Sequence, residues 1–271
     1  MSFVRDTGQG VFMNIWLIRH GMTLAGEEGR YQGFLDESLS EKGREVLVKA
    51  PYEPSHIYVS PAKRARETAS ILFPGAEQIC IPDLWEMNFG AFEGKTWKEM
   101  ENDPQYREWV DGWCLGTCPG GESRASFSSR VCSAFLDVLK REKERNDSAE
   151  DLFIVSHGGT QMAILEKWGR PARNYYDWQR PCGCGWKLSL KDSAFAEPAS
   201  AAVNPAGYIS RGPAADDRTD SAADAPMDPA AANSPMNPTA NAPEDPAANE
   251  SFELHVLEET CFAPGNTRKK M

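Results

Sequence analysis

Short apolar segments alternate with helix-like segments along most of this chain, and this alternation constrains the fold more than any other feature of the sequence. The apolar segments are typical of short buried strands. Helix signals lie between them, such as Ser or Pro at a first turn and apolar residues at helical spacing. The expected strands are 15–19, 56–60, 78–81 and 151–156, and the expected helices are 40–49, 61–72, 126–145 and 161–168. This pattern predicts an α/β fold, a three-layer sandwich whose mostly parallel central sheet has helices on both faces.

The end of the chain predicts an antiparallel edge for this sheet. Residues 186–190 and 252–256 both alternate apolar and polar side chains, as half-buried strands do. We expect the two segments to pair antiparallel, because a flexible loop between them adds closure entropy only with the logarithm of its length. The alternative is that residues 251–271 form a simple tail.

Composition divides the chain into four parts. Residues 1–13 are interpreted as an N-terminal extension, 14–192 as one folded domain, 193–250 as a disordered insertion, and 251–271 as a C-terminal strand and tail. The insertion is dominated by Ala, Pro, Asn, Asp and Ser, with a degenerate Pro-Met-Asp-Pro repeat. Such a segment buries too little apolar surface to offset the entropy lost on ordering. It also holds nine acidic and two basic residues, which account for most of the net charge of -11.

Charge and cysteine content exclude several classes of protein. The acidic balance argues against a nucleic-acid partner. No apolar run approaches 18 residues, and no charged segment followed by a long apolar one opens the sequence, so we expect no membrane partner. The seven cysteines include Cys114 with Cys118, and Cys182 with Cys184, whose spacings do not make two matched zinc knuckles. We expect free thiols in a reducing cytoplasm. The oligomeric state stays open.

Two of the four histidines follow apolar strands and precede glycine. His20 ends the segment LIRHG and His157 lies in FIVSHGG. The carboxyl ends of parallel strands meet at one edge of a sheet, so these imidazoles can face each other there. Arg19 lies beside His20, and Arg64 lies in the first turns of the helix after a third strand. The two imidazoles and the two guanidinium groups can all carry positive charge. Around one point they favour an oxyanion, and phosphate is the natural ligand.

These segments resemble the histidine phosphatase superfamily, the phosphoglycerate-mutase-like enzymes, over about residues 14–190. The matching segments are RHGMT at 19–23, RYQGFLDESLSEKG at 30–43, VSPAKRARETA at 59–69, LWEMNFGAFEG at 84–94, PGGES at 119–123 and VSHGGT at 155–160. They occur in the order of the family and near its spacing. No single segment is specific, but together they are.

The resemblance implies catalytic roles for five residues. His20 matches the nucleophile that becomes phosphohistidine. Arg19, Arg64 and His157 match the groups that hold the transferring phosphoryl group. Glu86 matches the acid that protonates the leaving oxygen, and its apolar surroundings can raise its pKa enough to keep it protonated. No cofactor and no metal are expected, because the arginines supply the electrostatic stabilisation that Mg²⁺ gives elsewhere.

Other positions allow a functional and a structural interpretation. Thr23, Gln32 and Gly33 match positions that contact phosphate or substrate. Met22 departs from the family, which usually has an acidic or polar residue there, and the Asn that usually follows the Thr23 position is absent. That absence puts a side-chain contact there in doubt.

The segment between residues 95 and 118 is rich in tryptophan. Trp97, Trp109 and Trp113 either pack as a helical lid or form an aromatic wall for a flat ring in the substrate. In the following PGGES segment, Glu122 or Ser123 caps the next helix, or the segment borders the substrate pocket.

Three function classes compete. A phosphomonoester hydrolase is favoured over an inactive binding module, because all five catalytic residues are present. A phosphoglycerate mutase needs a longer and more basic insert than residues 95–118 provide. Within the hydrolases, the short insert and PGGES resemble the alpha-ribazole phosphatases of cobalamin biosynthesis, with a broad-specificity sugar-phosphate phosphatase as the alternative. In either case the partner is a small-molecule phosphate ester.

Overall fold

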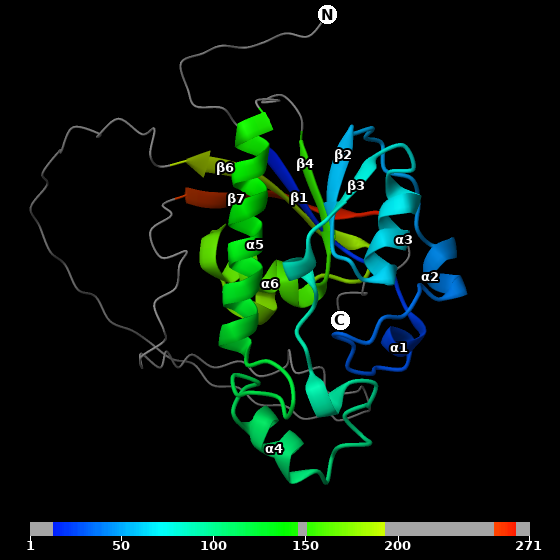
Figure 1. The fold of residues 1–271 in the computed structure, drawn as a ribbon, viewed down its shortest axis with the longest axis vertical. Coiled ribbons are helices and arrows are strands. Elements are labelled where there is room, and N and C mark those ends of the chain that lie inside the picture. The colour runs from blue at the N-terminus through cyan, green and yellow to red at the C-terminus, as the bar shows by residue number, and fades with distance from the viewer. Residues whose placement is uncertain (1–12, 146–150, 193–251, 264–271) are drawn as a thin grey trace, which may run out of the picture.

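A seven-stranded sheet with the order β3-β2-β4-β1-β6-β7-β5 runs through the centre of the molecule (Figure 1). The computed structural model describes residues 13–145, 151–192 and 252–263, so residues 1–12 of the expected extension and the whole 193–250 insertion lie outside the described residues. The strands are β1 Asn14–Arg19, β2 His56–Val59, β3 Glu77–Cys80, β4 Leu152–Ser156, β5 Gly169–Arg170, β6 Cys184–Asp192 and β7 Phe252–Cys261. The four strands expected in the first part of the chain are therefore confirmed, with small shifts of their ends.

The sheet has a parallel half and an antiparallel edge. In the parallel half, β1 pairs with β4, β4 with β2, and β2 with β3. Strand β6 runs antiparallel to β1, and β7 runs antiparallel to β6, with β5 parallel to β7 at the end. The fold class and the pairing of the two C-terminal segments are confirmed, and the alternative of a simple tail is wrong.

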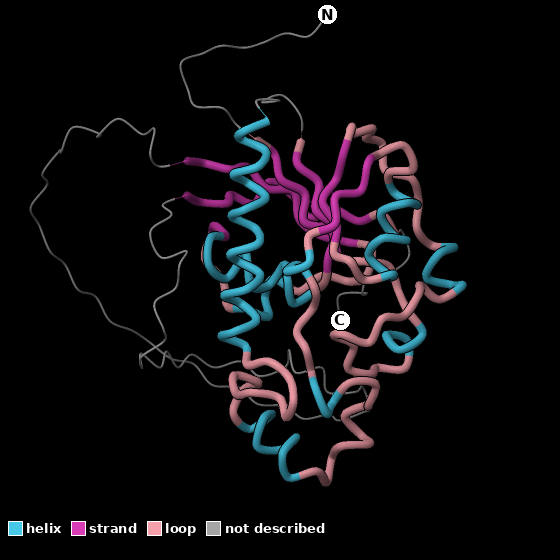
Figure 2. The backbone as a smooth tube through the Cα atoms, viewed as in Figure 1, coloured by secondary structure: helices cyan, strands magenta, loops and turns pink. Residues whose placement is uncertain are grey.

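Helices cover both faces of the sheet (Figure 2). They are α1 Leu24–Glu27, α2 Glu41–Glu45, α3 Lys63–Leu72, α4 Pro104–Asp111, α5 Arg124–Arg145 and α6 Gly158–Trp168, with short 3-10 turns at Pro82–Leu84, Gly90–Phe92 and Tyr175–Trp178. The helix expected over 40–49 ends early, at Glu45. Its last predicted turn is lost because the Val48 N–H donates to the Phe262 carbonyl at 2.9 Å, which draws the backbone toward the end of the chain.

Alternate residues of the strands pack into two cores. In β1, Ile15 and Leu17 pack with residues of α5 and α6, whereas Trp16 and Ile18 pack with residues of α3. This division follows from the strand period of two, which sends successive side chains to opposite faces. Because both faces are covered, β1 and β4 consist of continuous runs of mostly apolar residues.

Helix α4 lies beyond the end of the sheet at which α1 and α6 begin (Figure 1). Its buried rings, Tyr106 and Trp109, pack against Tyr31 and Phe92. The segment between 95 and 118 thus forms an aromatic layer over the carboxyl ends of the strands.

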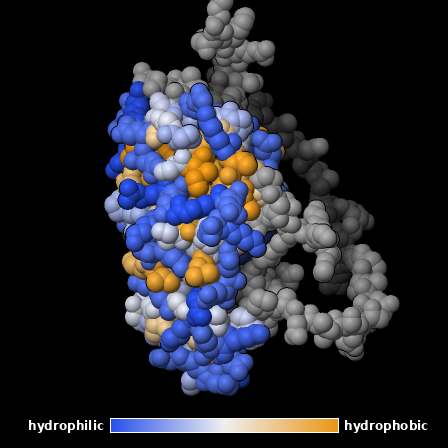
Figure 3. Space-filling view, turned by 90° about the vertical axis from the view of Figure 1, so that its right-hand side faces the viewer, coloured by the Kyte–Doolittle hydropathy of each residue, from blue (hydrophilic) through white to orange (hydrophobic). Residues whose placement is uncertain are grey.

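Hydrophilic side chains cover most of the face shown in Figure 3, and the apolar ones there lie in separate areas. Among the helices of the described ranges, none has both the length and the apolar character that crossing a membrane requires.

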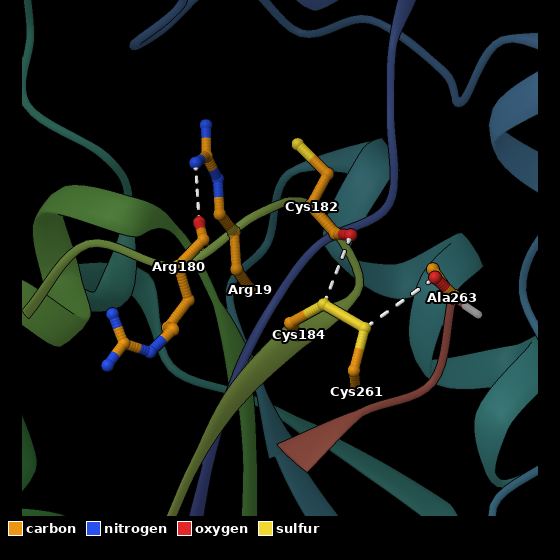
Figure 4. Close-up of a disulfide and its surroundings, with 6 residues drawn as sticks. All are labelled: Arg19, Arg180, Cys182, Cys184, Cys261 and Ala263. Atoms are coloured by element: carbon orange, nitrogen blue, oxygen red, sulfur yellow. Dashed lines mark hydrogen bonds between the residues drawn. A yellow bond between two sulfur atoms is a disulfide. The ribbon is translucent and has the colours of Figure 1, made fainter. Parts of the chain in front are cut away.

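Two of the cysteines expected as free thiols form a disulfide (Figure 4). Cys184 begins β6, Cys261 ends β7, and the register places them directly opposite each other. The expectation of free thiols is therefore wrong for this pair, because strand pairing joins residues 77 positions apart. Free thiols in the described part of the chain include Cys80, which is exposed, and Cys114 and Cys118, which are buried.

Candidate active site

Strands β1 and β4 bring His20 and His157 to the same edge of the sheet. The strands are adjacent and parallel, with Arg19 opposite Ser156. The backbone N–H of His20 donates to the Ser156 carbonyl at 2.9 Å, which continues the pairing of the two strands one residue further. The two imidazole centroids are 5.2 Å apart, and the rings meet edge to face.

His20 is held as a neutral imidazole with a free lone pair. Its Nδ1 lies 2.7 Å from the Gly21 carbonyl, and a carbonyl only accepts, so Nδ1 carries the proton. Nε2 then has the lone pair. Burial lowers the pKa of His20 well below its usual value, and the charges of Arg64 and Arg19 lower it further. The side chain is therefore suited to act as a nucleophile at neutral pH.

His157 stands at the N-terminus of α6, fully buried. Its Nε2 lies 2.7 Å from the Ser60 hydroxyl, and its ring stacks on Trp85 with 6.5 Å between centroids. Burial lowers the pKa of His157, as do Arg64 and the other nearby cationic groups. Sequence reasoning missed Ser60, although its position at the end of a third strand at the same edge was a usable signal.

Arg64 is fully buried in the first turn of α3. Its Nη1 donates to the Leu35 carbonyl and its Nη2 to the Gly33 carbonyl, both at 2.8 Å. Burial lowers the pKa of this guanidinium, and the carboxylate of Glu86 opposes the shift. Since an arginine stays charged in proteins, the pocket contains a fixed positive charge.

Arg19 supplies a second positive charge. Its Nη1 donates to the Arg180 carbonyl at 2.8 Å, while its buried Nε has no hydrogen-bond partner among the described residues. A Cβ at Gly158 would lie 3.3 Å from this Nε, so the side chain lies directly against the start of α6. A helix N-terminus and two guanidinium groups together favour an anion here.

Glu86 follows the 3-10 turn that ends at Leu84. One carboxylate oxygen accepts from the Gly159 N–H and the other from the Met87 N–H, each at 2.9 Å. Burial raises the pKa of Glu86, while these two hydrogen bonds and the charges of Arg64 and Arg19 oppose the shift. The carboxyl group is buried, and its two hydrogen bonds fix its orientation. Its raised pKa favours the protonated form, which a general acid requires.

The backbone around Glu86 is held by α5. Arg130 forms a two-point ion pair with Glu122 and donates to the carbonyls of Trp85 at 3.1 Å and Glu86 at 3.3 Å. Ser123 accepts from a backbone N–H in the first turn of α5 at 3.1 Å. The capping interpretation of PGGES is confirmed, since Ser123 caps the helix, and Glu122 supports the segment that carries Glu86. That PGGES borders the substrate pocket stays a prediction.

Thr23 and Gln32 bond to each other and to their neighbours. The Thr23 hydroxyl donates to Gln32 Oε1 at 2.8 Å and accepts from the Gly26 N–H, which caps α1. The Gln32 amide donates to Glu37 at 2.9 Å. The backbone carbonyl of Gly33 contacts the site, because it accepts a hydrogen bond from Arg64. Direct substrate contacts of these three residues stay predictions.

Glu93 acts as a structural carboxylate for the loop that holds Arg64. It accepts from the backbone N–H groups of Gly33, Phe34, Leu35 and Phe89 at 2.8–3.1 Å.

An aromatic cavity of about 120 Å³ opens beside Glu86. The rings that line it come from α4, from the 3-10 turn at Tyr175–Trp178 and from two loops: Tyr31, Phe89, Trp109, Tyr175 and Tyr176. The Arg124 guanidinium, which also lines it, lies 3.7 Å from the Tyr175 centroid. Tyr175 and Tyr176 lie outside every recognised motif, so sequence reasoning missed them.

The three tryptophans of the 95–118 segment have different positions. Trp109 lines the cavity, while Trp97 packs half-buried against the main core. Trp113 is 47% exposed. The aromatic-wall interpretation therefore applies to one of the three, and the others do not line this cavity.

The structure brings His20, His157, Arg19, Arg64 and Glu86 together around one point. A neutral nucleophile, two fixed cations and a buried acid are the groups needed to transfer a phosphoryl group and protonate its leaving oxygen. The aromatic cavity lies directly beside this acid.

Comparisons with known proteins agree with this geometry. The family model described as "Histidine phosphatase superfamily (branch 1)" matches residues 15–195. An adenosylcobalamin/alpha-ribazole phosphatase of Salmonella typhimurium is 30% identical over 184 residues, 64% of this chain and 88% of the relative.

Solved structures of similar proteins share the fold. The alpha-ribazole phosphatase from Shigella flexneri has a TM-score of 0.56 and 27% identity, covering 68% of this chain and 92% of that one. A mycobacterial glucosyl-3-phosphoglycerate phosphatase has a TM-score of 0.54 and 26% identity, covering 66% and 90%. The matched proteins are thus phosphatases that act on different esters.

Proposed function

This chain belongs to the histidine phosphatase superfamily, and we propose that it removes the 5′-phosphate of alpha-ribazole phosphate, or of adenosylcobalamin phosphate, through a phosphohistidine at His20. Family and phosphatase relatives make it a phosphoric monoester hydrolase acting on a small-molecule phosphate ester. We propose the cytoplasm as its compartment, with the free thiols of Cys80, Cys114 and Cys118 in its favour.

In the first step of the proposed reaction, Nε2 of His20 attacks the phosphorus and the bond to the ester oxygen breaks. Arg19, Arg64 and His157 stabilise the charge on the phosphoryl oxygens. This needs little reorganisation because the groups are already fixed in a buried site. Glu86 gives its proton to the departing oxygen, so the product leaves as an alcohol rather than as an alkoxide.

In the second step, water attacks the phosphohistidine and the N–P bond breaks. The carboxylate of Glu86 takes the proton from the attacking water, and phosphate leaves. His20 is again neutral and Glu86 is again protonated, so the cycle closes without a further reactant.

The aromatic cavity is the observation that supports the substrate. Its rings lie directly beside the acid that protonates the leaving oxygen. A flat benzimidazole would stack on such rings, and each well-formed aromatic contact contributes about 0.5–1.5 kcal/mol beyond its buried area. The Salmonella relative, named for this substrate, points the same way.

The second candidate is a broad-specificity sugar-phosphate phosphatase. The structural similarity to a glucosyl-3-phosphoglycerate phosphatase favours it, because a sugar ring also fits against aromatic side chains. A phosphoglycerate mutase stays the weakest of the three, since the cavity has aromatic walls and Arg124 already pairs with Glu166.

Phosphate release from a panel of esters tests the proposal. The panel contains alpha-ribazole 5′-phosphate, 3-phosphoglycerate, fructose phosphates and p-nitrophenyl phosphate, each measured in EDTA, with His20→Ala as the control for contaminating activity. A strong preference for alpha-ribazole 5′-phosphate supports the proposal. Similar slow turnover of all the esters supports the general phosphatase instead.

A matched pair of variants tests the cavity itself. We expect Trp109→Leu to raise the KM for alpha-ribazole 5′-phosphate up to about tenfold through lost ring contacts, with a smaller effect on fructose phosphates. Trp113→Leu, in the same segment but exposed, should leave both KM values unchanged. Thermal melts confirm that each variant is folded, and equal effects of the two variants would contradict the assignment.

A further inference from the structure

The turn that precedes β6 holds the backbone of the proposed phosphate pocket. The Gly183 N–H donates to the carbonyls of both Arg19 and His20, at 3.1 and 3.0 Å. Three residues earlier, the Arg180 carbonyl accepts from Nη1 of Arg19 at 2.8 Å. Residues 180–184 therefore support one arginine and the backbone of the nucleophile, although none of them belongs to a family motif.

The end of β7 closes on the other side of this turn. The Phe262 N–H donates to the Gly183 carbonyl at 2.9 Å, and the methyl group of Ala263 lies 2.8 Å from the position of a Cβ at Gly183. Phe262 and Ala263 are both buried. One glycine thus lies between the end of β7 and the start of the catalytic loop.

The Cys184–Cys261 disulfide ties these two sides together covalently (Figure 4). Figure 4 shows Arg19 and Arg180 on one side of the bond and Ala263 on the other. An ion pair from Arg180 to Glu259 of β7, at 2.6 Å, is a second link between the same segments. The covalent link is the one that a change of redox state can remove.

We propose that the Cys184–Cys261 pair is a redox-controlled clasp that sets the position of Arg19 and His20, so that the phosphatase is more active with the disulfide formed. Disulfides in reducing compartments are usually transient or redox-sensing. Residue Cys261 is exposed, whereas Cys184 is buried, so Cys261 is the side of the pair that faces a reductant in solution. The inference rests on the proposed roles of Arg19 and His20.

The opening reaction balances with a dithiol as the reductant. One thiolate of the dithiol attacks the Cys261 sulfur, and Cys184 leaves as a thiolate. The second thiol of the reductant then attacks the mixed disulfide and releases Cys261. Two electrons pass to the protein cysteines, two protons end on their thiols, and the reductant becomes a disulfide.

The test compares the full-length protein in its oxidised and dithiothreitol-reduced states. Alkylation and mass spectrometry report whether Cys184 and Cys261 are bonded. We expect reduction to lower kcat/KM for p-nitrophenyl phosphate about tenfold, because small displacements of catalytic groups have large effects on rate. The affinity for inorganic phosphate, measured by calorimetry, should fall in the same direction.

Two variants separate the clasp from other cysteines. Cys261→Ser should have the activity of the reduced protein in both conditions. Cys80→Ser should keep the full response, because Cys80 is an exposed free thiol on β3, at the opposite edge of the sheet. The comparison on the unmutated protein stands even if Cys261→Ser does not fold.

Several results would overturn the inference. One is equal kcat/KM and equal phosphate affinity in the two states once alkylation shows that the bond has opened. Another is a pair that stays unbonded under oxidising conditions. A purely structural disulfide would change the melting temperature without changing kcat/KM well below it. If no ester is hydrolysed, the proposed substrate class fails, whereas the phosphate affinity still tests the clasp.

Discussion

Glu86 is subject to opposing influences on its charge. Two backbone N–H groups and two arginines favour its carboxylate form, but burial outweighs them and the pKa is raised. The same burial lowers the pKa of His20. The nucleophile therefore has its lone pair at neutral pH, and the acid keeps its proton to a higher pH than an exposed glutamate does.

This arrangement predicts an acidic optimum for esters with poor leaving groups. As the pH rises through the raised pKa of Glu86, the proton donor is lost and kcat/KM falls. On the acid side, activity is lost only where His20 protonates, well below its usual value. The check is kcat/KM for alpha-ribazole 5′-phosphate or a fructose phosphate measured across the pH range.

Glu86→Gln separates the acid from the rest of the site. We expect kcat for a fructose phosphate or for alpha-ribazole 5′-phosphate to fall about 10²–10⁴-fold, the usual contribution of a general acid, with loss of the alkaline limb. For p-nitrophenyl phosphate, whose leaving group needs no proton, the loss should be much smaller. Full activity on the alkyl esters with a flat pH profile would contradict the assignment.

Gly159→Ala tests the contact that orients the acid. A Cβ at Gly159 would lie 2.2 Å from a carboxylate oxygen of Glu86, so the carboxyl group must move. We expect kcat on fructose phosphates to fall at least about tenfold, because the proton donor is displaced. Gly75→Ala is the control, since a Cβ at Gly75 meets nothing within 4 Å. Equal kcat values for the two variants would argue against this geometry.

At the scale of elements, strands with continuous apolar side chains were the easiest to predict. Both faces of the sheet are covered, so β1 and β4 show this pattern clearly. The end of α2 could not be predicted, because it depends on the bond from Val48 to Phe262 at the far end of the chain. The antiparallel edge was predictable from alternation, but its register was not.

The disulfide shows why register matters. The pairing of β6 with β7 shifts by one residue between Lys187 and Leu188. This irregularity brings Cys184 opposite Cys261, whereas a regular ladder counted from the other end would not. No signal in either strand marks where such a bulge falls, so the sequence could not assign the pair.

The site was predictable where motifs carry it. Five residues lie in segments that match the family, and the structure brings them together. Arg130 acts through packing between elements, and three of the cavity rings, Trp109, Tyr175 and Tyr176, come from segments without a motif. Such contacts depend on tertiary structure, which a single sequence read alone does not reveal.

Opening the disulfide should also lower the stability of the sheet edge. The bond closes a loop between residues 77 positions apart, and a disulfide typically contributes about 2–4 kcal/mol to the free energy of unfolding. Urea unfolding of the oxidised and reduced proteins measures the difference. An unchanged midpoint after verified reduction would show that the strand pairing alone holds this edge.

At the scale of the whole molecule, the last residue of β6 lies opposite the first residue of β7, with Asp192 paired to Phe252. Residues 193–251 can therefore be replaced by a two-residue turn such as Asn-Gly. If the insertion is disordered, as its composition predicts, the free energy of unfolding should rise by about 2–3 kcal/mol from reduced loop-closure entropy.

Activity should survive this replacement, since the catalytic residues lie at other elements. Urea unfolding and kcat/KM of the shortened protein check the two expectations. A large loss of kcat/KM with the fold intact would instead assign the insertion a direct part in catalysis.

The position of β7 after the insertion has a consequence for synthesis. The parallel strands and β6 all leave the ribosome before residue 193, but β7 follows only after the insertion. At roughly 5–20 residues per second, this leaves β6 without its outer neighbour for about 3–12 s. An unpaired strand edge is a template for association with other chains. The nascent protein therefore passes through a period in which its sheet is open on the side nearest the catalytic loop, and a chaperone would have its greatest effect in this interval.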